Sequence, residues 1–315
     1  MNNKIQINPK LEKILPLENL IKKCAPNYKE LGVSVVLDGG APYTVFLNAG
    51  HGGMKPSWQL VYKALLAKGK PGDIFKEYTT YKTGDGKLFR HGQQNSKIWQ
   101  LHKHPYIAEE MAEFHSAGWF FEGVENRNYI AALVDALKPK VASGLLNVVV
   151  MSHEWKDTNR LGRINLANAI FAAQKRENSK ARAFWLGWHF NASPNNNANG
   201  ICIFTSVGQT HSDKVAEAAL NNFQKLGFLP FDIKLAQSGI PQVATVRTQM
   251  ADGDKDHEAN FDEVRLTNMP AILGEFGFFD NKVDATRIFY DPEYKQVCVA
   301  AVCDALLSDV RGQIF

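Results

Sequence analysis

Long hydrophobic runs are missing from this 315-residue chain, and none of its apolar stretches approaches the roughly 20 residues that a membrane-spanning helix needs. The opening stretch MNNKIQINPKLEKILPLENLIKKC carries polar side chains throughout. It therefore lacks the continuous apolar core and the small-residue cleavage site of a signal peptide. We expect a protein that is made in the cytoplasm and is not embedded in a membrane.

Cysteine is scarce, and charge of one sign does not accumulate. The chain has four cysteines, which are Cys24, Cys202, Cys298 and Cys303. Their spacing contains no CxxC pair and fits no disulfide framework, so we expect reduced core thiols. The net charge is only +4, and no block of consecutive Lys and Arg stands out. Nucleic acid is not expected as a partner, whereas a diffuse attraction to anionic polymers such as bacterial wall material stays open.

The composition that is present, 45% hydrophobic and 22% charged residues, is that of an ordinary globular protein. From Tyr43 onward, short apolar stretches such as YTVFLNAG, LNVVVMS, ARAFWLGWHF, GICIFTS and PAILGEF alternate with longer helical patterns. Strands separated by helices of ten or more residues are typical of α/β folds. We predict a single mixed, mostly parallel sheet with helices on both faces.

Two segments fall outside this alternation. Residues 1–40 contain the amphipathic stretch LEKILPLENLIKKC, interrupted by Pro16, and we expect a small N-terminal extension ahead of a catalytic domain at 41–315. A stretch at about 54–120 shows no sustained period, which predicts a long insertion. Segments of that length inside a compact domain are usually functional or mobile.

The stretch VFLNAGHGG runs an apolar strand into His51, set among glycines. A tight turn that needs glycine at positive φ would explain this ending, with His51 a spectator. Two further strand ends, FWLGWHFNAS and MPAILGEFGFFDN, however, carry His189 and Glu275. Strand C-terminal ends are where open α/β sheets bind ligands. Between His51 and His189 in the sequence, GWFFEGVENRNY places Glu122 just before a helix.

These residue types suit metal-assisted hydrolysis. Two histidines and a carboxylate, with one coordination position left for water, form the ligand set of a hydrolytic zinc site. The ion keeps net positive charge, so its water can approach a neutral pKa and attack a carbonyl polarised by the same ion. A second carboxylate must take the water's proton and return it to the leaving nitrogen. Glu275 has the right type and location for that role.

The motifs LNAGHGG, FEGVENRNY, DTNRLGRINLANAI, WHFNASPNNNANGICIFTS and PAILGEFGFFDN resemble, in order, those of the zinc-dependent N-acetylmuramoyl-L-alanine amidases of the amidase-3 type, which include phage and prophage wall lysins. The resemblance implies one zinc ion per chain, held by His51, Glu122 and His189, with Glu275 as general base and acid. It also implies cleavage of the amide between N-acetylmuramic acid and the L-alanine of the peptidoglycan stem peptide.

Some positions depart from the family pattern or leave a choice. Ala49 stands where many relatives have proline, and Gly187 and Trp188 stand where a serine and an aliphatic residue are common. These changes concern substrate fit more than metal binding. Glu125 can be aligned as the ligand in place of Glu122. We prefer Glu122 because a residue at a loop end is freer to aim, whereas an acidic residue inside a helix start has the separate role of complementing the helix dipole.

Three neighbouring motifs have simpler interpretations. His153 ends the strand VVVMS and could be a ligand, but its motif is structural in the resembled family, so we expect a residue at the surface or in the layer behind the ligands. Asp157 and Arg163 are expected to form an ion pair that fixes the loop before the next helix. The acidic stretch ADGDKDHE lacks the spacing of a calcium loop and predicts a polar loop.

Besides the zinc amidase, two functions stay open: a peptidoglycan-binding or particle-assembly protein that retains the fold, and a zinc peptidase that cuts within the stem peptide. Candidates at all four chemical positions favour the enzyme, because a pure binder need not keep Glu275. Without an export signal, we expect the protein to reach the cell wall after release or delivery. The apolar positions of residues 1–40 could dock on a phage or delivery-particle partner, or they could pack on the catalytic domain.

Overall fold

A computed structural model of the chain describes residues 15–52, 80–82, 88–90, 101–102, 120–193, 198–230, 232, 234, 244–249, 253–279, 281, 283–284, 287–288 and 291–314. The strands are β1 (Val35–Leu37), β2 (Tyr43–Ala49), β3 (Thr80–Lys82), β4 (Leu88–Arg90), β5 (Leu101–His102), β6 (Phe120–Phe121), β7 (Asn147–Val150), β8 (Arg182–Asn191), β9 (Ile201–Thr205), β10 (Leu229–Pro230), β11 (Thr245–Val246), β12 (His257–Glu258) and β13 (Ala271–Phe278). The helices are α1 (Leu17–Cys24), α2 (Tyr28–Leu31), α6 (Glu122–Ala142), α7 (Arg160–Glu177), α8 (His211–Lys225), α10 (Asp262–Arg265) and α12 (Pro292–Val310).

One central sheet organises the described part of the chain. Its strand order is β1-β7-β2-β8-β13-β9-β11-β10, with β12 paired to β9. The middle strands β7, β2, β8 and β13 run parallel to one another, whereas β1 and β9 pair antiparallel with β7 and β13. The predicted mixed, mostly parallel sheet is therefore confirmed, and each of the five apolar stretches quoted above forms a strand in it.

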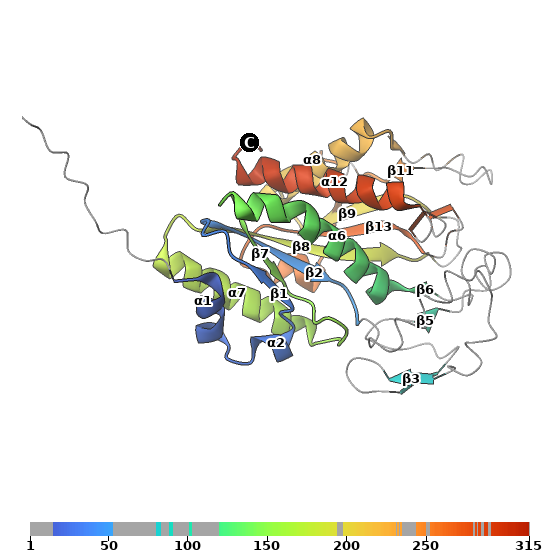
Figure 1. Ribbon diagram of the computed structural model, residues 1–315. Helices are drawn as coiled ribbons and strands as arrows, with labels where there is room; N and C mark the ends of the chain where they lie inside the picture. Colours follow the sequence, from blue (N-terminus) through green and yellow to red (C-terminus); the bar gives the residue numbers. More distant parts are fainter. Residues whose placement is uncertain are drawn as a thin grey trace, which may run out of the picture.

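Helices cover both faces of this sheet, as predicted. In Figure 1, α6, α8 and α12 lie on one side of the strands, and α1, α2 and α7 lie on the other. Because side chains of a strand point alternately to opposite faces, β2 contributes Val45 and Leu47 to the core under α6, α8 and α12 and Phe46 to the core under α7. The same alternation holds in β8, where Trp188 and Trp185 enter these two cores respectively. The middle strands are thus buried on both faces, which fixes their register.

The described part of the predicted N-terminal extension packs on this fold. Leu17 and Ile21 of α1 and Tyr28 of α2 are buried in the core that α7 covers. Strand β1 adds an edge strand to the sheet, with Val35 opposite Val150 of β7. The apolar side chains of residues 17–24 that could have docked on a partner are therefore largely in contact with this chain's own core.

Deleting residues 1–40 is expected to prevent stable folding. The deletion removes β1 and five side chains of that core, which are Ala25 and the larger Leu17, Ile21, Tyr28 and Val33. The four larger side chains account for most of the loss. Their burial contributes roughly 6–12 kcal/mol at about 1.5–3 kcal/mol each, which is comparable to the entire stability of a typical domain. Thermal unfolding followed by circular dichroism measures the effect, with substitution of the exposed Lys23 by alanine as a control. A truncated protein that unfolds cooperatively near the wild-type temperature would contradict this prediction.

The predicted long insertion at about 54–120 lies largely outside the described residues. Its described pieces are the antiparallel pair β3–β4 and strand β5, which pairs antiparallel with β6. Strand β6 leads directly into α6. The insertion therefore connects the end of β2 to the beginning of α6, and both of these positions matter for the site described below.

The cysteines and the helices agree with the composition. All four cysteines are free thiols, and Cys202, Cys298 and Cys303 are buried, which confirms the prediction of reduced core thiols for these three. Burial raises the pKa of the Cys202 thiol to about 12, so this thiol stays protonated and unreactive. No helix within the described ranges is long and apolar enough to cross a membrane.

Candidate metal centre

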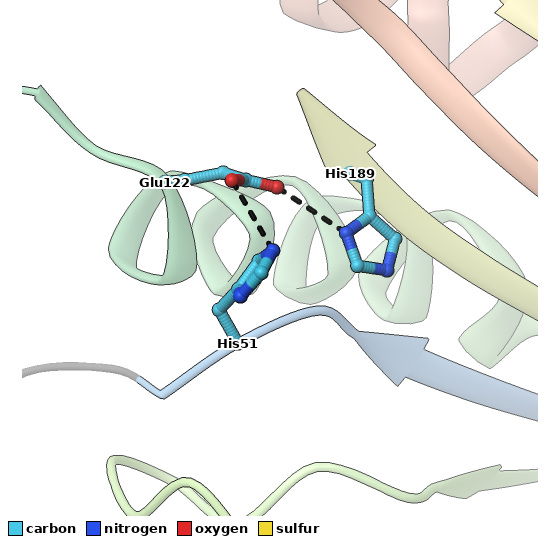
Figure 2. A group of neighbouring side chains, drawn as sticks. All are labelled: His51, Glu122 and His189. Carbon is cyan, nitrogen blue, oxygen red and sulfur yellow. Dashed lines mark hydrogen bonds and ion pairs between the residues drawn. The ribbon is translucent and has the colours of Figure 1, made fainter. Parts of the chain in front are cut away.

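Three predicted ligands meet at the carboxyl edge of the sheet. His51 follows β2, His189 lies near the end of the parallel neighbour β8, and Glu122 is the first residue of α6. Figure 2 shows the Glu122 carboxylate between the two imidazoles. Glu122 Oε2 lies 3.3 Å from His51 Nε2, and Glu122 Oε1 lies 3.2 Å from His189 Nδ1. The rings of the two histidines are nearly perpendicular, at 83°.

The spacing of these donors fits a metal ion. One potential ligand atom from each of the three side chains lies within 4.8 Å of the other two. A tetrahedral zinc ion with bonds of about 2.0–2.1 Å separates its ligand atoms by about 3.3–3.4 Å, close to the 3.2 and 3.3 Å found from Glu122 to the two imidazoles. Two imidazoles and one carboxylate are also the donor set of catalytic rather than structural zinc. These residues could therefore hold one such ion.

The backbone at His51 has an uncommon conformation. His51 itself adopts a positive φ of 58°, a region that non-glycine residues seldom occupy. The Arg127 guanidinium stabilises it by donating to the His51 carbonyl at 2.9 Å and to the Gly123 carbonyl at 2.7 Å. The sequence left open a turn in which a glycine has positive φ. Among the described residues of this turn, His51 has the positive φ and Gly50 and Gly52 do not; such strain is typical of functional sites.

A glycine is needed at position 50 for a different reason, because the His189 ring lies very close to the backbone there. A Cβ atom at this position would lie 2.0 Å from Cε1 of His189. The backbone of Gly50 is held on both sides, since its N–H donates to the Trp188 carbonyl at 3.0 Å and its carbonyl accepts from Asn126 Nδ2 at 3.1 Å. The absence of a side chain thus lets the His189 ring lie directly on the turn that carries His51.

Glu122, and not Glu125, belongs to the potential metal-binding group within the described part of the chain. Its Oε1 accepts hydrogen bonds from the Phe190 N–H at 3.2 Å and from Asn126 Nδ2 at 3.3 Å. Burial would raise the pKa of Glu122, but the charges of His51 and His189 and these contacts outweigh it and lower the pKa to about 2. Glu125 is buried as well and accepts from Asn128 at 3.1 Å. Asn126, four residues after Glu122, therefore links the carboxylate to Gly50.

Glu275 lies beside this group on β13. It pairs with His189 in the register of β8 and β13, so both side chains point to the same face of the sheet. Its Oε2 atom is buried and has no hydrogen-bond partner among the described residues. Burial raises the pKa of Glu275 to about 8, with the His189 charge acting in the opposite direction and the charges of Glu122 and Glu263 adding to the rise. A carboxyl group with a pKa near neutrality is suited to proton transfer.

Two further residues of the site escaped the sequence analysis. Glu263 of α10 is only 3% exposed, and its Oε1 lies 3.3 Å from His189 Nε2, the nitrogen that does not face Glu122. Arg127, described above, also donates through Nε to the His153 carbonyl at 3.0 Å. Arg127 lies inside the quoted motif FEGVENRNY, but the sequence analysis assigned it no role, and none of the quoted motifs contains Glu263. Two features of the sequence could have pointed to them. Gly187, within a strand of bulky side chains, indicates the close approach of another group such as Glu263, and Arg127 is a basic residue five positions after Glu122 in the same helix.

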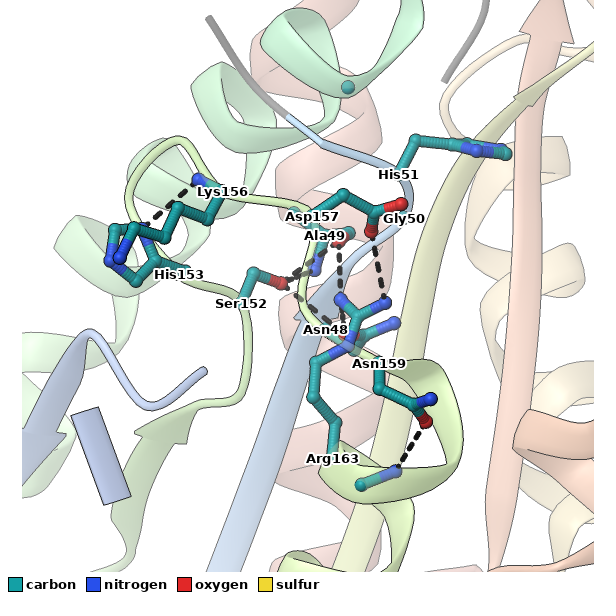
Figure 3. A network of polar contacts seen from close by, with 12 residues as sticks. Asn48, Ala49, Gly50, His51, Ser152, His153, Lys156, Asp157, Asn159 and Arg163 are labelled. Atoms are coloured by element: carbon teal, nitrogen blue, oxygen red, sulfur yellow. Dashed lines mark hydrogen bonds and ion pairs between the residues drawn. The ribbon is translucent and has the colours of Figure 1, made fainter. Parts of the chain in front are cut away.

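A polar network supports the turn from the side opposite the ligands (Figure 3). Arg163 Nη1 donates to Asn48 Oδ1 at 2.8 Å, and its Nη2 lies 3.8 Å from Asp157, which confirms the predicted ion pair. Ser152 Oγ donates to the Ala49 carbonyl at 2.9 Å. His153 Nδ1 accepts from the Trp155 and Lys156 N–H groups, both at 3.1 Å. His153 thus closes a turn, as expected of a structural residue.

The described part of the acidic stretch ADGDKDHE, residues 253–258, forms bends that end in β12, in agreement with the predicted polar loop. Its Asp254 and Asp256 lie near Asp213 of α8, and the three could hold a cation. Asp213, however, accepts from the Thr210 backbone N–H in the capping box that begins α8, and Asp256 accepts from Thr205 Oγ1. These carboxylates therefore already have structural partners.

The mixed sheet of this α/β fold presents two imidazoles and two buried carboxylates at one edge. This arrangement is typical of a hydrolase with a metal-assisted site. The sequence matches the amidase-3 family model, described as N-acetylmuramoyl-L-alanine amidase, over residues 45–308. The chain belongs to this family. Membership supports an amidase activity on peptidoglycan and confirms the predicted enzyme class.

Two solved structures are similar to this chain in fold. The N-acetylmuramoyl-L-alanine amidase Ami1 from Mycobacterium smegmatis is similar at 16% identity with a TM-score of 0.50, over 87% of this chain and 99% of that chain. The N-acetylmuramoyl-L-alanine amidase from Clostridium difficile 630 is similar at 18% identity with a TM-score of 0.49, over 86% of this chain and 98% of that chain. Identities this low concern the fold. A search of curated proteins gives no match.

Proposed function

We propose that this chain is a zinc-dependent amidase that hydrolyses the bond between N-acetylmuramic acid and the L-alanine of peptidoglycan stem peptides. One zinc ion per chain would be held by His51, Glu122 and His189. The observation that carries this proposal is the position of Glu122, whose carboxylate oxygens lie 3.3 Å and 3.2 Å from the two imidazoles. These residues lie at the edge of the central sheet in a chain that belongs to the amidase family.

Zinc bound by these residues would act as a Lewis acid on the amide carbonyl and would lower the pKa of a bound water. Residues of the chain carry out the proton transfers. Glu275, whose Oε2 has no hydrogen-bond partner in the described part of the chain, accepts the proton of the attacking water as hydroxide adds to the carbonyl carbon. It then delivers this proton to the amide nitrogen as the carbon–nitrogen bond breaks. The products are the free lactyl carboxylate of the muramic acid and a stem peptide with a free L-alanine amino group.

Mass analysis of purified cell walls after incubation tests the bond that is cut. An amidase releases intact stem peptides that begin with L-alanine and leaves glycan strands with free lactyl groups. Products shortened within the stem peptide would instead identify a zinc peptidase. Walls that stay intact while the protein sediments with them would identify a peptidoglycan-binding protein.

The protein purified without added metal is expected to contain one zinc ion per chain and to lose activity in a chelator. Glu122→Ala should lose the zinc, because it removes the donor that lies between both histidines. Glu125→Ala, a change of another buried carboxylate in the same helix, should retain it. Elemental analysis of the three proteins gives the answer. Zinc kept by the first variant and lost by the second would reverse the ligand assignment.

A further inference from the structure

The carboxylate of Glu263 occupies space that a neighbouring strand leaves open. Glu263 is part of the four-residue helix α10 and is 3% exposed. A Cβ atom on Gly187 of β8 would lie 2.4 Å from its Oε2. An alanine at position 187 would therefore collide with the carboxylate. The glycine and the glutamate fit each other, two residues before His189 on the same face of β8.

Two donors fix one oxygen of this carboxylate. Oε2 accepts from Asn48 Nδ2 at 2.9 Å and from Trp185 Nε1 at 3.2 Å. Asn48 is itself held by Arg163, which donates to its Oδ1 at 2.8 Å. Both donors are fully buried. The position of the carboxylate is thus determined without His189, and its second oxygen is left for the imidazole.

That second oxygen, Oε1, lies 3.3 Å from His189 Nε2. Among the described residues, His189 is the ion-pair partner of Glu263, and no Lys or Arg forms a salt bridge with it. A buried carboxylate is destabilising unless it is paired and hydrogen-bonded. The arrangement is favourable when the imidazole keeps a proton on Nε2, because the Nε2–H group then donates a hydrogen bond to Glu263.

We infer that Glu263 is a positioning residue for the metal ligand His189. By accepting a hydrogen bond from Nε2–H, it fixes the ring and selects the tautomer whose lone pair is on Nδ1, the nitrogen 3.2 Å from Glu122. Partners of this kind on metal-binding histidines raise metal affinity. The inference rests on the proposed function, in which His51, Glu122 and His189 hold zinc.

The test is the zinc affinity of Glu263→Gln, measured by competition with a chromogenic chelator. The amide keeps the size of the side chain but can present an N–H to His189, which opposes the required tautomer. We expect affinity to fall about 10- to 100-fold, while the metal-free protein unfolds near the wild-type temperature. Asp309→Asn is the matched control, because Asp309 is also a buried carboxylate and lies 2.6 Å from a histidine, His211. It belongs to α12, outside the metal group, and should leave the affinity unchanged.

A second measurement needs no variant. In the zinc-loaded wild-type protein, ¹⁵N NMR of the histidine side chains should show His189 protonated on Nε2 and not on Nδ1. Protonation on Nδ1, or equal zinc affinities of wild type and Glu263→Gln, overturns the inference alone. A wild-type protein that takes up no zinc overturns the proposed function and this inference with it.

Discussion

Replacing Gly50 with alanine is expected to disrupt the candidate metal group strongly. The new Cβ would lie 2.0 Å from Cε1 and 2.3 Å from Nδ1 of His189. Because the Gly50 backbone is held by hydrogen bonds to Trp188 and Asn126, the imidazole has to move instead. A misplacement of about 1 Å in a catalytic group can reduce the rate about 10²-fold, and we expect zinc affinity and turnover to fall together by at least that factor.

Gly162→Ala is the matched control for this substitution. Gly162 lies in the first turn of α7, where an added Cβ would come no closer than 3.7 Å to Asn159. Alanine is also the better helix former, by about 1 kcal/mol. Titration with zinc and hydrolysis of purified walls should show wild-type values for Gly162→Ala. Normal zinc binding by Gly50→Ala would mean that the turn, rather than the His189 ring, gives way.

Glu275→Gln is the second substitution with a large expected effect. The glutamine is close in size to the glutamate but cannot accept a proton, so the fold and the bound zinc should persist while kcat falls roughly 10²- to 10⁴-fold. Elemental analysis and thermal unfolding measure the first two properties, and wall hydrolysis measures the third. Glu293→Gln, which neutralises an exposed carboxylate at the start of α12, should leave all three unchanged.

The pH dependence provides an independent check on Glu275. A proton acceptor must be ionised, so wild-type activity should decline as pH falls through the pKa of Glu275. Burial and the neighbouring carboxylates raise that pKa to about 8 in the metal-free chain, and a bound cation lowers it. Chelated and zinc-loaded protein should therefore titrate Glu275 at different pH values. If Glu275→Gln retained a near-normal rate with the same acidic decline, the proton acceptor would be another residue.

The candidate site residues that could be predicted from the sequence lie at the ends of regular elements, and the structure brings them to one edge of the sheet. His51, His189 and Glu275 each follow an apolar stretch, and parallel strands bring their carboxyl ends to one edge. Glu122 could be placed because it precedes a long helical pattern, although Glu125 could not be excluded on spacing alone. The structure separates the two by orientation, because the first residue of α6 faces both histidines.

Glu263 could not be predicted in this way. Its role depends on where a four-residue helix docks, and short irregular segments carry no periodic signal. Gly187 was visible as a glycine inside a strand, a feature that often marks a close approach by another group. The sequence around Gly187 does not show that the approaching group is the Glu263 carboxylate. In the same way, the contacts of residues 17–24 with α7 depended on tertiary packing that an amphipathic pattern does not specify.

Strand β8 joins the proposed metal ligand His189 to the aromatic core through its alternating side chains. His189 lies between Trp188 and Phe190, which point to the other face; Trp188 stacks on Phe276 at 3.7 Å, and the ring of Phe190 meets Tyr129 edge-on at 5.1 Å. A slip of β8 by one residue would carry His189 into this apolar layer and turn an aromatic ring toward the catalytic edge. Such a slip would also bury an imidazole without a partner. Substitutions at Trp188 or Phe190 that disturb the register of β8 should therefore misdirect the His189 side chain, although neither aromatic ring needs to contact it.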